Sequence, residues 1–471
     1  MGSLIRIWPA NILITDISGN QLTSSPVQPT AGIYPDKRNE IPNGFYVPWL
    51  LSTAWLATGR SGETENVRGT GGGLHEVFAW SQIDFTFQSE AIRQKALRSG
   101  DFIPESNLPL GLELYKGRVF ITLPKWKKGV PATLTWVPLA ERTRSPLLRP
   151  YPSWAWHVPG NCHGLTSVFR IAVDECGRLW VVDSGSVNIV SGVKHVCTPQ
   201  ILVFDLETDR LIWRYYIPKE QLPEGTLLTN IAVDVITCER TFAYVSDVFR
   251  YGVIVYDLKQ DKSWRVEHQY FFPDPLKGKF DIDGLTFRWN DGVFGLALSP
   301  VERGTRYLYF HPLSSQREFV VETKVLHNET TAKSEADMFK IVGEPRMREK
   351  GQASGSAMDR NGVLFYNLIS KAAVGCWNSH IGEHSPRTHG IIDQNNITLS
   401  FPNDLKVDHE LNQGLWVLSN RLHKYLYSKL DPNDINFRVL STSVKDAVRG
   451  TPCETGYVLP PKKPNQCQLV Y

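Results

Sequence analysis

The sequence lacks the short motifs that identify several enzyme classes. It has no G-x-S-x-G, no glycine-rich phosphate loop and no HExxH, which would mark a nucleophilic serine, a nucleotide site or a catalytic zinc. Its formal net charge is only +3 over 471 residues, whereas a nucleic-acid surface needs clustered positive charge. The sequence therefore gives no support for a hydrolase, a nucleotide-dependent enzyme or a nucleic-acid-binding protein, and it predicts no nucleic-acid partner.

Apolar runs long enough to span a membrane are also missing. The strongest one, at 45–59, follows Lys37 and Arg38; its core of about 13 apolar residues is shorter than the ~20 of a membrane span and suits a signal peptide. It lies too far from Met1 for an ordinary signal. We expect residues 1–72 to be a leader, and we favour a start assigned too far upstream over an uncleaved anchor or a disordered segment.

What the sequence does contain is a repeated hairpin pattern. An apolar lead-in, a turn with Asp, Asn or Gly, and a second strand rich in aromatic and β-branched residues recur six times. The aromatic anchors are Phe120, Trp180, Tyr244, Phe294, Phe365 and Trp416, spaced by 60, 64, 50, 71 and 51 residues. Such spacing fits four-stranded blades that must stack to exclude water. The prediction is an all-β, six-bladed propeller.

The repeats fall in one uninterrupted region. From Gly73 onward there is no Pro/Ser-rich linker or charge run, so we expect a single domain over 73–455, followed by a Pro/Lys-rich tail at 456–471. Period-two alternation dominates, and the one helical pattern is at 89–101, where a short helix should end at Gly100.

The seven cysteines indicate disulfides rather than a metal site. No CxxC or zinc-type Cys/His spacing occurs, and disulfides belong to an oxidising compartment. Two sequons, at Asn328 and Asn396, fit a secreted glycoprotein. One cysteine is left over, and we expect it to be Cys467.

One group of residues does invite a metal interpretation. It consists of Cys376, His380, His384 and His389. Gly382 and Pro386 interrupt the intervening segment, which therefore reads as a loop and not as a helix with a His pair. We predict no metal and no cofactor.

The segment LTSVFRIAVDECGRLWVVDSG strongly resembles the insect Yellow and major royal jelly protein family. The blocks FAWSQIDFTF, SGDFIPESNLPLGLELYKGRVFITLPKW, PATLTW, FFPDPLKGKFDIDGLTFRWNDGVFGLALSP, NLISKAAVGCWNS, HGIIDQNN and FPNDLKVDHELNQGLWVLSNR keep the family's order over about 77–440. The DECGRLWV, PATLTW and FFPDP blocks are closer to Yellow proteins than to royal jelly proteins.

The resemblance implies a secreted, disulfide-bonded six-bladed propeller. It suggests three disulfides, Cys162 with Cys197, Cys176 with Cys238 and Cys376 with Cys453. It also implies that a strand at 77–86 closes the ring by pairing with strands near 436–444, which would leave no open sheet edge.

In a propeller, the first residues of each lead-in strand reach the central channel. These are Pro109 to Gly111, Thr166 to Phe169, Thr229 and Asn230, Asp281 to Gly284, Ser354 to Ser356, and Asn403 to Leu405. Their mixture of polar, acidic and aromatic side chains suits a small polar aromatic ligand, or else serves only strand ends and channel water.

Some relatives are known to bind biogenic amines in this channel, and the resemblance carries two positions over. Thr388 in PRTHGII and Asn403 in FPND match the amine-binding pattern, whereas the aromatic expected two residues after the Asn is Leu405 here. Phe169 would supply an aromatic wall and Asp283 a charge partner for an ammonium group.

Three functions remain open at this stage. The first is a secreted protein of cuticle or eggshell pigmentation or hardening that binds catechols or amines in its channel. The second is an isomerase converting dopachrome in the melanin pathway, for which the candidate acids and bases are His163, His389, Asp281 and Asp283. The third is a non-catalytic extracellular scaffold that binds matrix proteins.

Overall fold

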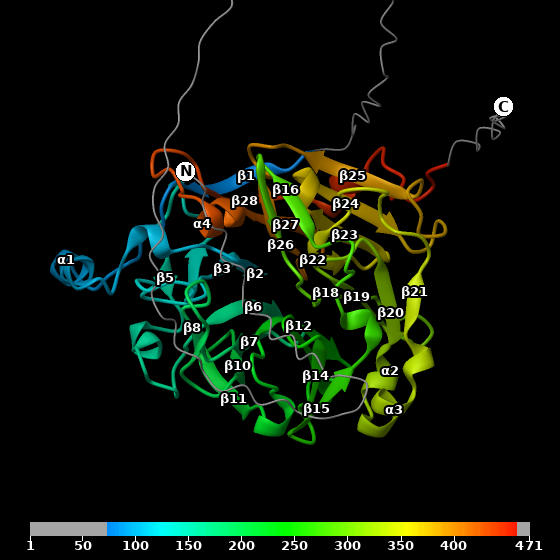
Figure 1. Cartoon of the computed structure of the whole chain (residues 1–471), viewed down its shortest axis with the longest axis horizontal. Helices are drawn as coiled ribbons and strands as arrows, with labels where there is room; N and C mark the ends of the chain where they lie inside the picture. Colours follow the sequence, from blue (N-terminus) through cyan, green and yellow to red (C-terminus); the bar gives the residue numbers. More distant parts are fainter. Residues whose placement is uncertain (1–72, 459–471) are drawn as a thin grey trace, which may run out of the picture. The chain divides into compact units, whose positions relative to one another are not determined.

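The structure is a computed structural model and describes residues 73–458. This part of the chain contains six four-stranded antiparallel sheets (Figure 1). They are arranged as the blades of a propeller, and the prediction of an all-β, six-bladed fold is confirmed. The expected leader at 1–72, with its apolar stretch 45–59, and Cys467 in the tail lie outside the described residues.

Five blades are built from consecutive segments, each named here from its innermost strand outward. The first is β2 (Gly111–Tyr115), β3 (Arg118–Thr122), β4 (Leu134–Pro138) and β5 (Arg149–Pro150). The second is β6 (Val168–Val173), β7 (Arg178–Asp183), β10 (Gln200–Asp205) and β11 (Arg210–Tyr216). The third is β12 (Leu228–Val235), β13 (Thr241–Asp247), β14 (Gly252–Asp257) and β15 (Lys262–Glu267).

The fourth blade is β18 (Val293–Leu298), β19 (Tyr307–Pro312), β20 (Glu318–Glu322) and β21 (Lys340–Val342). The fifth is β22 (Ala353–Met358), β23 (Val363–Leu368), β24 (Ala373–Asn378) and β25 (His389–Gln394). Smaller elements are the hairpins β8 (Ser186–Val187) with β9 (Lys194–His195) and β16 (Lys279–Ile282) with β17 (Leu285–Arg288). The helices are α1 (Glu90–Ser99), α2 (Thr323–Leu326), α3 (Glu329–Ser334), α4 (Leu422–Tyr427) and α5 (Val444–Val448).

The sixth blade joins the two ends of the described chain. It contains β26 (Phe401–Val407), β27 (Gly414–Asn420), β28 (Phe437–Ser443) and, as its outermost strand, β1 (His75–Trp80). His75 pairs with Ser441 and Trp80 with Phe437. The expected closure is therefore present, but the strand ends at Trp80, because Phe85 bridges Leu148 of the first blade instead.

The sequence pattern assigned the aromatic anchor of the fourth repeat, Phe294, to the wrong strand of its blade. In the second, third and fifth blades the aromatic anchor lies on the second strand, opposite an alanine of the innermost strand: Trp180 faces Ala172, Tyr244 faces Ala232 and Phe365 faces Ala357. In the fourth blade the equivalent pair is Tyr309 opposite Ala297, whereas Phe294 lies on the innermost strand.

The cause is the separate hairpin β16–β17. Its two turn residues, Asp283 and Gly284, both have positive φ, 49° and 77°, and an Asp-Gly pair is favoured in such a tight turn. The segment Leu285–Arg288 therefore pairs with Lys279–Ile282 and not with the blade. The expectation that Asp281 to Gly284 begin a channel strand is wrong.

Smaller predictions can be compared directly with the structure. Helix α1 is capped by Ser89, whose hydroxyl accepts from Ile92 N, and it ends at Gly100 with φ 71°. Three disulfides join Cys162 to Cys197, Cys176 to Cys238 and Cys376 to Cys453, the pairs that the resemblance implies. None of the helices in residues 73–458 is long and apolar enough to cross a membrane.

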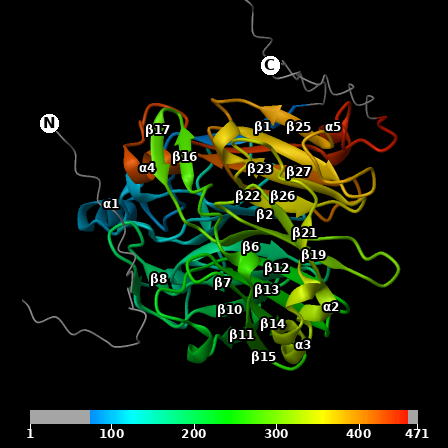
Figure 2. The ribbon, with the colours of Figure 1, turned by 45° about the vertical axis from the view of Figure 1, so that its right-hand side comes forward.

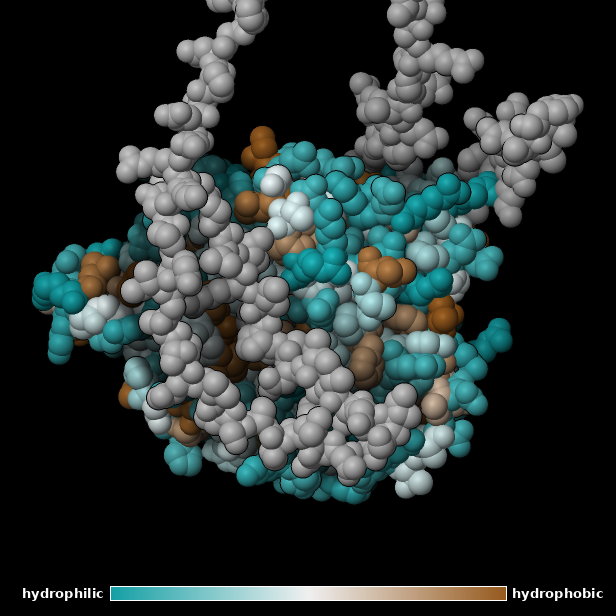
Figure 3. Space-filling view, in the orientation of Figure 1, coloured by the Kyte–Doolittle hydropathy of each residue, from teal (hydrophilic) through white to brown (hydrophobic). Residues whose placement is uncertain are grey.

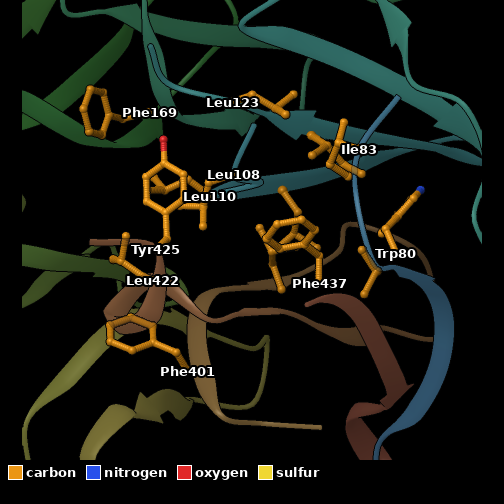
Figure 4. Packing of buried hydrophobic residues seen from close by; sticks show 14 of the residues in the cluster. Trp80, Ile83, Leu108, Leu110, Leu123, Phe169, Phe401, Leu422, Tyr425 and Phe437 are labelled. Carbon is orange, nitrogen blue, oxygen red and sulfur yellow. The ribbon is translucent and has the colours of Figure 1, made fainter. Parts of the chain in front are cut away.

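Apolar side chains from distant segments meet at the junction of the sixth and first blades. Figure 4 shows Trp80, Leu110, Phe169, Tyr425 and Phe437 in one cluster, drawn from β1, the first two blades, α4 and β28. Each is at most 2% exposed. On the described surface that is visible, hydrophobic residues form small separated patches among hydrophilic ones (Figure 3).

Candidate functional site

Five of the six innermost strands are irregular close to their first residues. The register with the second strand shifts between Val168 and Ile171, Leu228 and Asn230, Val293 and Gly295, Ala353 and Ser356, and Pro402 and Asp404. Bulges of this kind re-aim side chains and are common next to functional sites. The residues at these shifts include Phe169, Arg170, Thr229, Phe294, Ser354 and Asn403.

A side chain from another strand satisfies each of four bulge carbonyls. Asn230 Nδ2 donates to Phe294 O at 2.8 Å, and His311 Nε2 lies 3.2 Å from Ser354 O. The Thr122 hydroxyl donates to Phe169 O, and Arg170 Nη2 donates to Asn403 O. Because the carbonyls that leave the ladder are bonded in this way, the bulges are fixed features of the ring.

Arg170 is the most unusual residue at this level. Its side chain is fully buried, yet it reaches from β6 to β26, where Nε lies 3.3 Å from Asp404 Oδ1 and Nη2 lies 3.3 Å from Asn403 Oδ1. The guanidinium carbon lies 4.4 Å from the centre of the Phe294 ring. Burial lowers the pKa of Arg170 and Asp404 opposes that shift; an arginine remains charged in this setting.

A second ion pair lies next to it. Glu113 of β2 and Lys406 of β26 approach to 3.1 Å, and Lys406 also donates to Ile171 O at 2.7 Å. Burial raises the pKa of Glu113, against the effect of Lys406. The innermost strands are thus joined by charged groups, and the side chains of Phe169 and Asn403, 2% and 1% exposed, present almost no free surface.

Asp283 occupies a different position, at the tip of the β16–β17 hairpin that stands beside α4 (Figure 2). Its Oδ2 accepts from Ser400 Oγ at 2.7 Å and lies 3.2 Å from His423 Nε2 and 3.3 Å from Lys424 Nζ. Burial opposes the charge, but the bonds from Ser400 and Lys424 and the nearby His423 outweigh it and lower the pKa of Asp283. The carboxylate is ionised at neutral pH.

A cavity of about 560 Å³ opens at this hairpin. It lies at the end of the ring where β26 begins, since Ser400 directly precedes that strand. Its walls combine two carboxylates with two lysines and several neutral polar groups. They are Asp281, Ile282, Asp283, Gly284, Lys350, Ile369, Ser370, Lys371, Ala372, Gln394, Asn396 and Ser400.

Thr388 does not lie on a channel strand. It directly precedes β25, the outermost strand of the fifth blade, and its hydroxyl donates to Glu383 O at 2.7 Å. It lines a second cavity of about 560 Å³ between loops of the fourth and fifth blades, with Gln316, Glu344 and Arg348 among its neighbours. Neither of these two cavities contains both Thr388 and Asn403, so the expected pairing of these residues is absent from both.

The candidate acids and bases are dispersed, apart from Asp281 and Asp283. His163 is exposed and lies 3.5 Å from the Tyr216 hydroxyl on the outer strand of the second blade. His389 is buried against the Tyr366 hydroxyl, and burial, with smaller effects of His384 and Arg346, lowers its pKa well below the usual value.

The Cys/His group around 376–389 does not converge on one point. Cys376 is bonded to Cys453, His380 pairs with Glu302 at 2.7 Å, and the rings of His384 and His389 lie 4.3 Å apart. Residues 73–458 contain no group of three or more His, Cys, Asp or Glu side chains suited to hold a metal ion.

Sequence reasoning missed Arg170 and the role of the Phe294 ring, and it included Asp404 in the range Asn403 to Leu405 without giving it a partner. A signal was present in VFRIAV, where one arginine interrupts a strand of otherwise apolar residues. A charge inside a fully buried strand requires a partner, but no sequence pattern says that the partner lies 234 positions away in β26.

Comparisons with known proteins identify several relatives of this chain. A sequence model of the family described as major royal jelly protein matches residues 166–453. Protein yellow of Drosophila yakuba is 42% identical over 387 residues, covering 81% of this chain and 71% of that protein. Protein yellow of Drosophila melanogaster is 41% identical over the same shares. Among solved structures, a luciferin-regenerating enzyme covers 72% of this chain and 91% of its own at 12% identity, with a TM-score of 0.42.

Proposed function

The chain belongs to the major royal jelly protein family and is similar over 81% of its length to a Yellow protein. From this we propose that it is a secreted pigmentation protein that binds a small catechol or catecholamine. Three disulfides within the propeller support an oxidising, extracellular compartment. The binding site in this proposal is the cavity beside the β16–β17 hairpin.

The observation that carries the proposal is the ionised Asp283 on the wall of that cavity. A carboxylate kept charged by its neighbours is a fitting partner for an ammonium group. Lys350 and Lys371 line the same space and provide donors for catechol oxygens. A volume of about 560 Å³ is within the range of small-molecule sites.

The level of Phe169 and Asn403 is a less suitable place for an amine in this chain. Arg170 already occupies the space between Phe294, Asn403 and Asp404, and Phe169 and Asn403 are only 2% and 1% exposed, so they offer a ligand almost no surface. We therefore place the ligand at the hairpin cavity. In this proposal Asn403 belongs to the ring of innermost strands and does not contact the ligand.

Conversion of dopachrome is a second candidate, and one observation favours it. Asp281 and Asp283 line the same cavity as two lysines, so an acid and a base are both within reach of a bound quinone, as a tautomerisation needs. The same cavity would serve ligand binding and dopachrome conversion, and a measurement of dopachrome turnover distinguishes the two functions.

Two sequons fit the secreted state. The Asn328 side chain caps α3 through Oδ1, which accepts from Thr331 N at 3.0 Å, so Nδ2 is left for an N-linked glycan. Asn396 is exposed at the rim of the hairpin cavity. We propose that both carry glycans.

Thermal unfolding with dopamine, serotonin, octopamine and dopachrome tests the proposal. A ligand at 100 times its dissociation constant stabilises a protein by about 2.7 kcal/mol, and Asp283→Asn should abolish the shift, because Asn keeps the turn but loses the charge. Thr388→Ala, in the peripheral cavity, is the matched control and should keep it. Loss of the shift in Thr388→Ala or Asn403→Ala but not in Asp283→Asn would refute the assigned site. No shift with any ligand would refute binding and leave the scaffold function. Loss of dopachrome absorbance catalysed by the protein would establish the isomerase.

A further inference from the structure

The guanidinium of Arg170 is held by the groups that proteins use to hold a free organic cation. An aromatic face lies 4.4 Å below it, a carboxylate oxygen of Asp404 lies 3.3 Å away, and Asn403 offers both its backbone and side-chain oxygens. Cation–π attraction, a buried carboxylate and neutral acceptors together form a recognition set for guanidinium and ammonium ions.

Two of these groups, Asp404 and Phe294, are positioned without the help of Arg170. Asp404 Oδ2 accepts from Leu112 N at 3.0 Å, and Oδ1 accepts from Leu405 N at 2.9 Å. The backbone of Phe294 is fixed by Asn230, which donates to its carbonyl at 2.8 Å. The set therefore belongs to β18 and β26, whereas the cation enters from β6 on a flexible side chain.

We propose that Arg170 is a resident cation that fills a preformed organic-cation site in the central channel, and that it decides what the channel accepts. With Arg170 in place, guanidinium and ammonium compounds are excluded at this level. Without its side chain, the channel binds them. This inference goes beyond the proposed function, because it concerns a different site.

The buried carboxylate of Asp404 makes the site require a positively charged ligand. Its side chain is only 2% exposed, and a buried carboxylate without a positive partner is strongly unfavourable. Removing Arg170 leaves this charge and the Phe294 face in place. A small cation of matching shape restores the pair, whereas a neutral molecule of the same shape fills the space but not the charge.

The test compares ethylguanidinium with its neutral analogue ethylurea on the full chain carrying Arg170→Ala. Ethylguanidinium at millimolar concentration should raise the melting temperature of this variant by about 2 °C or more, ethylurea should not, and the wild type should respond to neither. Titration calorimetry should show one ethylguanidinium bound per Arg170→Ala chain. Adding Asp404→Asn or Phe294→Leu should weaken that binding at least about tenfold.

Equal rescue by ethylurea would reduce the effect to cavity filling and overturn the proposal. So would absence of rescue in a folded variant, or binding that survives Asp404→Asn. If Arg170→Ala is not secreted, Arg170→Met keeps the volume but leaves the buried Asp404 carboxylate without its partner, so Arg170→Met/Asp404→Asn should be more stable than Arg170→Met at neutral pH. A double variant no more stable than Arg170→Met at neutral pH overturns the proposal.

The two proposals fail separately. Asp283→Asn in the Arg170→Ala background should leave ethylguanidinium binding unchanged, since Asp283 lies at the hairpin cavity. Ethylguanidinium binding that depended on Asp283 would place the cation in that cavity and contradict the assignment to Arg170.

Discussion

At the scale of single residues, the ring is held together by buried charges whose partners come from other blades. Arg170 of β6 reaches Asp404 of β26, and Lys406 of β26 reaches Glu113 of β2. Breaking such a pair by removing one partner costs about 3–5 kcal/mol, because the other charge stays buried. These buried residues are not exposed themselves, but they limit which ligands could bind between the innermost strands.

Asp291, just before β18, is a carboxyl that makes stability depend on pH. Burial raises its pKa to about 7, so between pH 4 and pH 7 the folded state binds more protons than the unfolded state. Stability then falls as pH rises through this window. Asp291→Asn should remove the fall, with a gain of about 1–3 kcal/mol above pH 7 and none at pH 4.

Chemical unfolding of both proteins from pH 4 to 8 measures this, and Asp283→Asn is the control of opposite sign. The pKa of Asp283 is lowered, so its stabilising contribution is present at neutral pH and is lost in acid as it becomes protonated. Asp283→Asn should thus be less stable than wild type at pH 7 and equal to it in acid. Parallel pH profiles for Asp291→Asn and wild type would disprove the assignment.

At the scale of elements, adjacent innermost strands approach so closely that side chains are excluded. A Cβ on Gly111 of β2 would lie 2.6 Å from Phe169 O of β6, and that carbonyl belongs to a fixed backbone. Gly111→Ala should therefore cost about 1–3 kcal/mol through overpacking. Equilibrium unfolding in guanidinium chloride provides the measurement.

Gly382 supplies the matched substitution. A Cβ there would meet nothing closer than 3.4 Å, from Thr388 Cγ2, and Gly382→Ala should change stability by less than about 0.5 kcal/mol. If Gly111→Ala were equally mild, the two strands would not be in contact as described.

Elements also show where the sequence was sufficient and where it was not. Alternating apolar residues and turn signals were enough for six blades and for α1, because period and capping are local properties. These local signals misled us at Asp283-Gly284, whose turn joins β16 to β17 ahead of the fourth blade. Local turn chemistry specifies that a hairpin forms but not which sheet it joins, and the channel residues of that blade were misplaced for this reason.

The candidate site was predictable only in part, again for a physical reason. Phe169 and Asn403 do lie at the bulges of innermost strands, since strand order follows from the repeat. The burial of Arg170 and the peripheral place of Thr388 depend on contacts between blades and on the course of the loop before β25. Such contacts join residues that are far apart in the sequence, and a periodic sequence pattern does not predict them.

At the scale of the whole molecule, stability depends on closing the ring with eight residues at its amino-terminal edge. In β1, Phe78 and Trp80 are each 1% exposed, and Trp80 Nε1 donates to Pro146 O at 2.8 Å. Burying two such side chains contributes about 3–6 kcal/mol, a large part of a typical total stability of about 5–15 kcal/mol. Without β1, strand β28 would become an open edge.

A chain beginning at residue 81 should therefore be less stable than one beginning at residue 73, and it should associate through β28, because an unpaired edge is a template for another strand. Thermal unfolding and size-exclusion chromatography of the two chains test this. A synthetic peptide of residues 73–80 should bind the shorter chain by strand addition and restore the monomer, whereas the same peptide with Phe78→Ser and Trp80→Ser should not. Two monomeric chains of equal melting temperature would show that the ring does not need this closure, and the pairing of β1 with β28 would then be incidental to the fold.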